Sequence, residues 1–316
     1  LVDGAFWTVD TMFCAQPYAT VNPTFLYYAC TTIPFDLLST STALPSMTQG
    51  DLNAVRLPAP ETETQRLIAE FLDRETAKID ALIEKQEQLI ATLREDRAAT
   101  IHDTVTTNRV DPSRQALPLK RISRILDCKH ITAEFTSDGI PLASIREAQG
   151  RYVNLHTAKR TTEHFFRLLT SGGRLPRQGD LIFSRNATVG QVAEVQAMNE
   201  PFAMGQDVCL IRPDRSLVHA GFLWYSLRSD SVLRQLDLMM IGSTFKRINV
   251  EEVKNILIDV PSLEEQGLIL QFLDERISKI NSLIAKSTEM IETLREYRSA
   301  LITNAVTGKI DVREAV

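Results

Sequence analysis

The sequence has few of the features that mark a metal site, a secreted framework or a membrane protein. Its 316 residues include only four cysteines and five histidines, and no Cys-x-x-Cys pair. A disulfide framework or a zinc site is therefore not expected. No apolar run approaches the roughly 18 residues that a spanning helix needs, and no basic-then-apolar leader is present. We expect a soluble, cytoplasmic protein that makes no membrane contact.

The sequence contains an internal repeat with an offset of 201 residues. Phe71-Leu72-Asp73 recurs as Phe272-Leu273-Asp274, and Leu93-Arg94-Glu95 recurs as Leu294-Arg295-Glu296. Arrays of small repeats recur every 20–50 residues or so, whereas this offset is the length of a whole domain plus a connector. The repeat therefore indicates a duplicated unit made of two parts.

Each copied segment predicts one long helix. No glycine or proline interrupts residues 64–106, and a helix of that length measures about 64 Å and needs a helical partner. Residues seven apart form a seam on each helix. The predicted helix-pairing residues are Leu72, Ile79, Gln86 and Leu93 in the first copy and Leu273, Ile280, Ser287 and Leu294 in the second. We expect an antiparallel coiled coil in which Gln86 and Ser287 either face each other or face solvent.

The sequence between the predicted long helices predicts a globular domain of mixed helices and strands. Residues 113–258 contain strand-like runs such as 181–183 and 208–211, separated by glycine and proline turn signals. Residues 1–57 resemble the last third of the same globule, so the first copy is expected to be truncated at its N-terminal side. The predicted fold class is α+β, with mixed α/β domains joined by long paired helices. The expected segments are residues 1–57, 58–112, 113–258 and 259–316.

Charge is segregated along the chain although the net charge is only −5. Residues 113–258 hold 20 Lys and Arg against 14 Asp and Glu, while residues 58–112 hold 7 against 12. A basic globule next to acidic helices is the footprint that a polyanion such as DNA requires. An ordinary solvated surface is the alternative for any single cluster of cations.

The residue patterns do not predict a catalytic centre. Asn22-Pro23-Thr24-Phe25 loosely resembles the Asn-Pro-Pro-Phe loop of amino-methyltransferases, but the matching place in the second copy reads His219-Ala220-Gly221-Phe222. No glycine-rich fingerprint for a methyl donor or a nucleotide phosphate occurs. We therefore expect a non-enzymatic protein with no cofactor and no metal ion.

Several fragments stand in a fixed order along the chain: 179–182, 242–244, Val260-Pro261-Ser262-Leu263-Glu264-Glu265-Gln266 and the two Leu-Arg-Glu segments. Together with the duplicated helix, they resemble the specificity subunit of type I restriction-modification enzymes. The resemblance implies two target-recognition domains that read the halves of a split DNA site, with the long helices setting their spacing. It also implies partners: double-stranded DNA, two methyltransferase subunits and restriction/translocase subunits.

Loops of the second globule are the expected DNA contacts. The segment 184–188 offers an Arg suited to guanine and an Asn suited to adenine, and the segment 243–247 suits phosphates. The predicted DNA-binding residues are Ser184, Arg185, Asn186, Thr188, Ser243, Thr244, Lys246, Arg247, Lys159 and Arg160.

Two other functions remain open on the sequence. The chain could be the recognition region of a single-chain restriction-methylation enzyme, whose chemistry lies in another part. It could also be a purely structural coiled-coil adaptor, which would show no sequence-dependent DNA binding.

Overall fold

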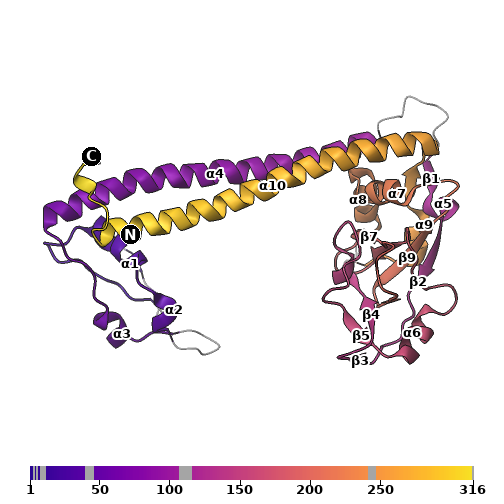
Figure 1. Ribbon diagram of the computed structural model, residues 1–316, viewed down its shortest axis with the longest axis horizontal. Coiled ribbons are helices and arrows are strands. Elements are labelled where there is room, and N and C mark those ends of the chain that lie inside the picture. Colours follow the sequence, from indigo (N-terminus) through magenta and orange to yellow (C-terminus); the bar gives the residue numbers. More distant parts are fainter. Residues whose placement is uncertain are drawn as a thin grey trace. The chain divides into compact units, whose positions relative to one another are not determined.

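The computed structural model describes residues 1–314, except residues 3, 5, 8–11, 40–45, 107–115 and 241–246 (Figure 1). The chain forms two compact units, residues 1–92 with 282–316, and residues 93–281. Both divisions fall inside the long helices, so each unit contains a globular part and its own stretch of paired helix. The four segments expected from the sequence follow one another along the chain. The two units differ from them, because pairing of the long helices brings together residues that lie far apart in the sequence.

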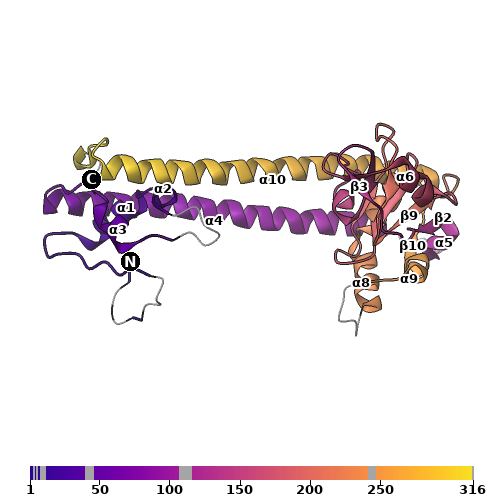
Figure 2. The ribbon, with the colours of Figure 1, turned by 90° about the horizontal axis from the view of Figure 1, so that it is seen from below.

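Two long helices run antiparallel. They are α4 (Thr62–Thr106) and α10 (Leu263–Val306), and they lie side by side in both views (Figures 1 and 2). In the first unit, Asp80 pairs with Arg298 at 2.8 Å and Glu87 with Arg295 at 3.2 Å. In the second unit, Asp96 pairs with Arg276 at 3.0 Å. Residue numbers rise on one helix as they fall on the other, which confirms the predicted antiparallel pairing of long helices.

The predicted seam residues are buried or partly buried on both helices. Leu72, Ile79, Leu273, Ile280 and Ser287 are buried, and Gln86, Leu93 and Leu294 are partly buried. Ser287 is only 6% exposed, so the solvent-facing alternative does not hold for it. A contact between Gln86 and Ser287 stays a prediction.

In the first unit, three short helices accompany the long ones: α1 (Pro23–Thr31), α2 (Phe35–Leu38) and α3 (Gln49–Ala54). Phe25 and Tyr28 of α1 belong to a buried apolar cluster with Leu72 of α4 and Ile302 of α10. The turn η2 (Val312–Glu314) adds Val312 to the same cluster. The cluster joins the helical globule to the paired helices of this unit.

The second unit contains three sheets, which the helices flank (Figure 1). An antiparallel sheet has the order β2 (Ser123–Asp127), β9 (Val208–Pro213), β6 (Leu181–Ser184) and β7 (Val192–Glu194). A second sheet has the order β3 (Phe135–Thr136), β5 (Lys159–Thr161), β4 (Ile140–Ala143) and β8 (Ala203–Met204), with β4 and β8 parallel. A short pair joins β1 (Ala116–Pro118) to β10 (Leu257–Asp259).

Apart from its stretches of α4 and α10, the helices of this unit are short. They are α5 (Leu119–Ile122), the turn η1 (Ile145–Ala148), α6 (Glu163–Thr170), α7 (Ala220–Leu227), α8 (Asp230–Met239) and α9 (Val250–Asn255). The two runs that read as strands in the sequence are β6 and β9. Both are buried on both faces, which explains why they are apolar without alternation.

The joint between globule and helix occurs in both units with matching hydrogen bonds. Gln65 and Gln266, near the starts of α4 and α10, each accept a hydrogen bond from a backbone N–H of the globule, of Asn22 and His219 respectively, at 2.8 Å. The phenol hydroxyls of Tyr28 and Tyr225 each donate to an aspartate, Asp73 and Asp274, at 2.7 Å. The sequence repeat is therefore a repeat of packing as well.

Among the described residues, no helix is both long and apolar enough to cross a membrane.

The buried Tyr28 predicts a loss of stability at high pH. Burial raises the pKa of its phenol to about 12, and the Asp73 carboxylate adds to the rise. In the unfolded chain the phenol ionises near a pKa of about 10, so the stability of the neutral phenol is complete below about pH 10 and is lost toward pH 12. Wild type is expected to exceed Tyr28→Phe in unfolding free energy at neutral pH, and the difference should shrink across that range. A difference that stays constant in pH-dependent urea unfolding contradicts this assignment.

Candidate nucleic-acid interface

Four strand ends meet at one end of the β2-β9-β6-β7 sheet. Asp127 ends β2 opposite Cys209, Ser184 ends β6 opposite Val208, and β7 begins at Val192 next to them. The loops that follow or precede these ends are residues 128–132, 185–191 and 205–207. Arg247 joins them through a bridge to Asn186. These residues are named the recognition edge.

The backbone of the recognition edge adopts unusual conformations. Ala187 has φ 56° and Asp207 has φ 69°, and they are the two non-glycine residues of positive φ in the described part of the chain. The two loops are tied together, because the Arg185 N–H donates to the Asp207 carbonyl at 2.8 Å. Non-glycine residues in this region cost energy and persist where surrounding contacts hold them, which is common at binding sites.

Arg185 is predicted to read a base, but the structure places it inside the edge. Only 3% of the residue is exposed, and Nη2 bonds Oδ1 of Asp127 at 2.6 Å and Sγ of Cys128 at 3.7 Å. Its Nε is buried and has no hydrogen-bond partner among the residues that the structure describes. A base contact would require the guanidinium to leave Asp127. In this conformation its side chain joins the ends of β6 and β2, and the sequence held no signal for this contact because Asp127 lies 58 residues away. The base contact predicted for Arg185 stays a prediction.

The neighbours of Arg185 divide between the inside and the surface. Ser184 is fully buried, and its hydroxyl bonds the Asn186 carbonyl at 3.1 Å. Asn186 is half-buried and its Oδ1 accepts from the Ala187 N–H at 2.9 Å, while Thr188 is exposed. Asn186 and Thr188 are therefore the members of the predicted 184–188 segment whose side chains reach the surface.

The remaining predicted contacts are spread more widely. Lys159 is exposed, and its ammonium lies 4.5 Å from the Phe135 ring centroid. Arg160, on the same strand, is held by the Gly139 carbonyl at 2.7 Å and by Glu200 at 2.9 Å. Arg247 is exposed at the recognition edge. The other predicted residues of that loop, Ser243, Thr244 and Lys246, lie outside the described residues.

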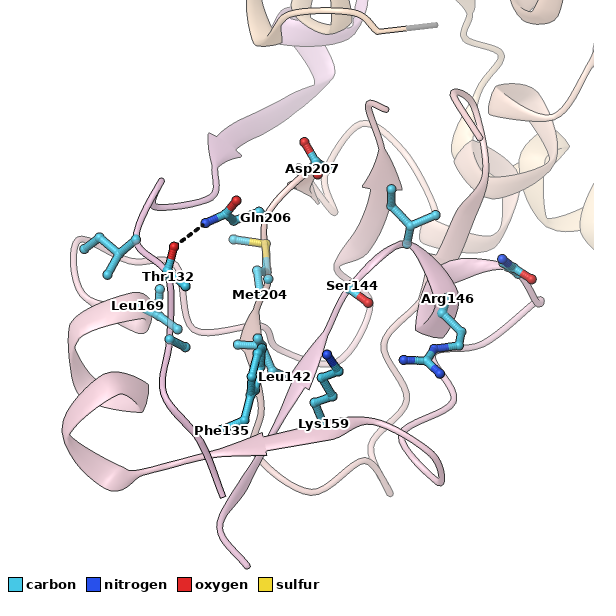
Figure 3. Close-up of a pocket in the computed structure, with 15 residues that line it drawn as sticks. Thr132, Phe135, Leu142, Ser144, Arg146, Lys159, Leu169, Met204, Gln206 and Asp207 are labelled. Carbon is cyan, nitrogen blue, oxygen red and sulfur yellow. Dashed lines mark hydrogen bonds between the residues drawn. The ribbon is translucent and has the colours of Figure 1, made fainter. Parts of the chain in front are cut away.

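A cavity of about 600 Å³ adjoins the recognition edge (Figure 3). Its apolar wall includes Phe135, Leu142 and Met204, and Lys159 and Arg146 bring positive charge to it. Gln206 donates to the Thr132 hydroxyl at 3.4 Å within the lining. Sequence spacing gives no signal for Arg146, Phe135 or Gln206, because their proximity depends on strand order.

One group of side chains at the edge has the composition of a metal site. Ligand atoms of Asp127, Cys128 and His130 lie within 4.8 Å of one another. Asp127 is already paired with Arg185, and burial raises the pKa of the Cys128 thiol. Both facts disfavour a metal ion there, since a bound metal needs a free carboxylate and a thiolate.

Comparison with known proteins places the chain in a family. The model of the "Type I restriction modification DNA specificity domain" matches residues 1–92 and 142–293. A putative type I restriction enzyme specificity subunit of Haemophilus influenzae is 22% identical over 311 residues, covering 95% of this chain and 77% of the relative. The MjaVIII specificity subunit of Methanocaldococcus jannaschii is 21% identical over 290 residues, covering 86% of this chain and 66% of the relative.

Solved structures share the fold. A chain from a structure that describes complex assembly and conformational transition of a type I restriction-modification system has a TM-score of 0.75 and 18% identity, and covers 91% of this chain and 71% of that one. The HsdS subunit of Thermoanaerobacter tengcongensis has a TM-score of 0.55 and 19% identity, and covers 92% and 71%. With its duplicated joint, its antiparallel long helices and a family match over most of its length, this chain belongs to the family of type I restriction-modification DNA specificity domains.

Proposed function

We propose that this chain is the DNA sequence-specificity subunit of a type I restriction-modification complex and performs no chemistry itself. The observation that carries the proposal is the recognition edge, a set of loops held on a buried sheet within the basic part of a chain of this family. Exposed loop residues on a rigid scaffold are suited to reading base edges. The surface members Asn186 and Thr188 are the proposed base contacts, and Arg185 is proposed to hold them in place.

The long helices supply the second half of the proposal. They set the spacing between two recognition domains, and their acidic faces dock two methyltransferase subunits, with restriction/translocase subunits joining the complex in the cytoplasm. The acidic balance of residues 58–112 supports docking through charge complementarity. The alternative is that the same region works within a single-chain restriction-methylation enzyme.

The proposal predicts which half of a DNA target the second unit reads. The chain is expressed with its methyltransferase partner in a methylation-free host, and methylated adenines are mapped by single-molecule sequencing. Wild type is expected to give a split target. Asn186→Ala should relax one position within a single half-site, because a bidentate base contact is worth about 1–3 kcal/mol, and Thr188→Ala, which removes one hydroxyl, should relax discrimination less.

An exposed arginine of the first unit provides the control. Arg66→Ala, on α4, removes surface pairs with Glu63 and Glu70 and is expected to leave the target unchanged. Methylation that shows no dependence on the chain would favour a structural adaptor and would contradict the proposal.

A further inference from the structure

A group of arginines surrounds Trp224 in the second unit. The guanidinium carbons of Arg151 and Arg228 lie 4.5 and 4.9 Å from the centroid of the Trp224 ring. Nη1 of Arg228 donates to Oε1 of Gln191, at the end of the recognition-edge loop 185–191, at 3.2 Å. The indole thus holds two cations in place beside a candidate DNA-reading loop.

A third arginine acts on the same group. Arg97, on α4, donates from Nη1 to Oδ1 of Asn281 at 2.9 Å. Burial lowers the pKa of Arg228, and the positive charges of Arg97 and Arg151 lower it further. Within the described part of the chain, the contacts of Arg97 and Arg228 are to amide oxygens, and neither forms an ion pair with a carboxylate. The cluster therefore carries positive charge that the chain itself does not neutralise there.

The first unit provides an internal comparison, because the same joint occurs in both. Thr32 and Ser229 follow α1 and α7, and each donates its hydroxyl to the carbonyl three residues earlier, Ala29 or Ser226, at 2.7 Å. The residue before each, Thr31 or Arg228, therefore holds the same place.

The two copies of the joint differ in charge. Arg298 is the counterpart of Arg97 by the 201-residue offset, and it forms a two-bond ion pair with Asp80 at 2.8 and 3.2 Å. The counterpart of Asp80 in the second unit is the neutral Asn281. In the first unit, the small Thr31 and Arg298 line a cavity of about 270 Å³. The second copy has thus lost a carboxylate and gained a guanidinium at matching positions.

Nearby carboxylates offset only part of this charge. Glu194 forms an ion pair with Nη1 of Arg151 at 3.0 Å and offsets the charge of that guanidinium. Asp274 accepts from Tyr225, as Asp73 accepts from Tyr28 in the first unit. Among the described residues, three guanidinium groups therefore accompany two carboxylates in the second unit, whereas Arg298 pairs with Asp80 in the first.

We propose that Arg151 and Arg228 form a site for a backbone phosphate of DNA, to which Arg97 adds positive charge, and this inference rests on the proposed function. Guanidinium forks suit phosphate oxygens, and partial burial strengthens such charge-assisted hydrogen bonds. Phosphate contacts fix the register of a protein on the duplex while neighbouring base contacts specify the sequence. Gln191 links the arginines to the recognition edge, so a phosphate held here orients the loop that carries Asn186 and Thr188.

The test measures the salt dependence of binding to a short mixed-sequence DNA duplex by the purified full chain. Each phosphate contact contributes about 0.9 to the slope of log affinity against log salt concentration. Arg228→Thr, which installs the first-unit residue, is expected to lower the magnitude of the slope by about that amount. Asn281→Asp, which installs the first-unit carboxylate beside Arg97, is expected to lower it similarly.

Two control variants separate this role from others. Arg228→Lys retains the charge and should keep most of the slope, and Arg66→Thr, an exposed arginine paired with two glutamates in the first unit, should leave it unchanged. If both Arg228→Thr and Asn281→Asp keep the salt slope of the wild type, the phosphate site is overturned. This holds whether or not either variant still co-purifies with the methyltransferase. Weakening confined to the methylated target sequence also overturns it. A wild-type chain that binds no duplex at all would contradict the proposed function itself.

Discussion

Replacing Gln266 with leucine is expected to lower the unfolding free energy of the second unit by about 3–5 kcal/mol. The side chain is fully buried and serves three backbone groups: the His219 N–H at 2.8 Å, the Leu217 carbonyl at 2.9 Å and the Pro261 carbonyl at 2.8 Å. Leucine fills the same volume but leaves all three unpaired, and each buried unpaired group costs about 1–3 kcal/mol, less what the added apolar side chain contributes.

Trp224 makes this prediction measurable in one unit. The chain has two tryptophans, and Trp224 is buried in the second unit whereas Trp7 is 95% exposed. In a Trp7→Phe background, urea unfolding followed by Trp224 fluorescence reports the second unit. Gln65→Leu leaves only two backbone groups unpaired in the first unit and should not shift the Trp224 transition. A loss under about 1 kcal/mol for Gln266→Leu would mean that water satisfies the freed groups.

The duplication could be predicted from sequence because both copies keep the residues that make the same contacts. Gln65 and Gln266, or Tyr28 and Tyr225, stand at matching places, and a long seam without proline or glycine specifies a paired helix. Self-comparison detects this directly, whatever the sheet between the helices looks like.

The sequence predicts where the loops of the recognition edge lie in the chain, but not which of their side chains are buried. A strand followed by Ser-Arg-Asn-Ala-Thr indicates a polar loop, but burial depends on partners from other strands. Arg185 reads as a free cation in the sequence, and only the pairing of β2 with β9 and of β9 with β6 brings Asp127 to it. The cluster of Arg97, Arg151 and Arg228 could not be predicted from the sequence for the same reason, since these residues lie on separate elements.

Removing the Asp127–Arg185 ion pair of the recognition edge is the second change expected to lower the unfolding free energy strongly. Arg185→Ala leaves Asp127 without its cation at 2.6 Å and removes the side chain that spans the loops. Breaking a buried pair costs about 3–5 kcal/mol, and since the Asp127 side chain is 34% exposed we expect about 2–3 kcal/mol here. Arg185→Lys should restore only part of this, because an ammonium cannot replace the two-sided contact to Asp127 and Cys128.

The same variant separates positioning from direct reading of a base. If Arg185 positions the loops, Asp127→Asn damages sequence discrimination as Arg185→Ala does, because both release the loops that carry Asn186 and Thr188. If Arg185 reads a base directly, Asp127→Asn frees the guanidinium and preserves discrimination, while Arg185→Ala relaxes one position alone. Methylation mapping with each variant, beside Trp224-monitored unfolding, distinguishes the two. Discrimination lost in both variants, together with a stability loss of about 2–3 kcal/mol for Arg185→Ala, is the result expected from a buried arginine that holds the recognition edge in place.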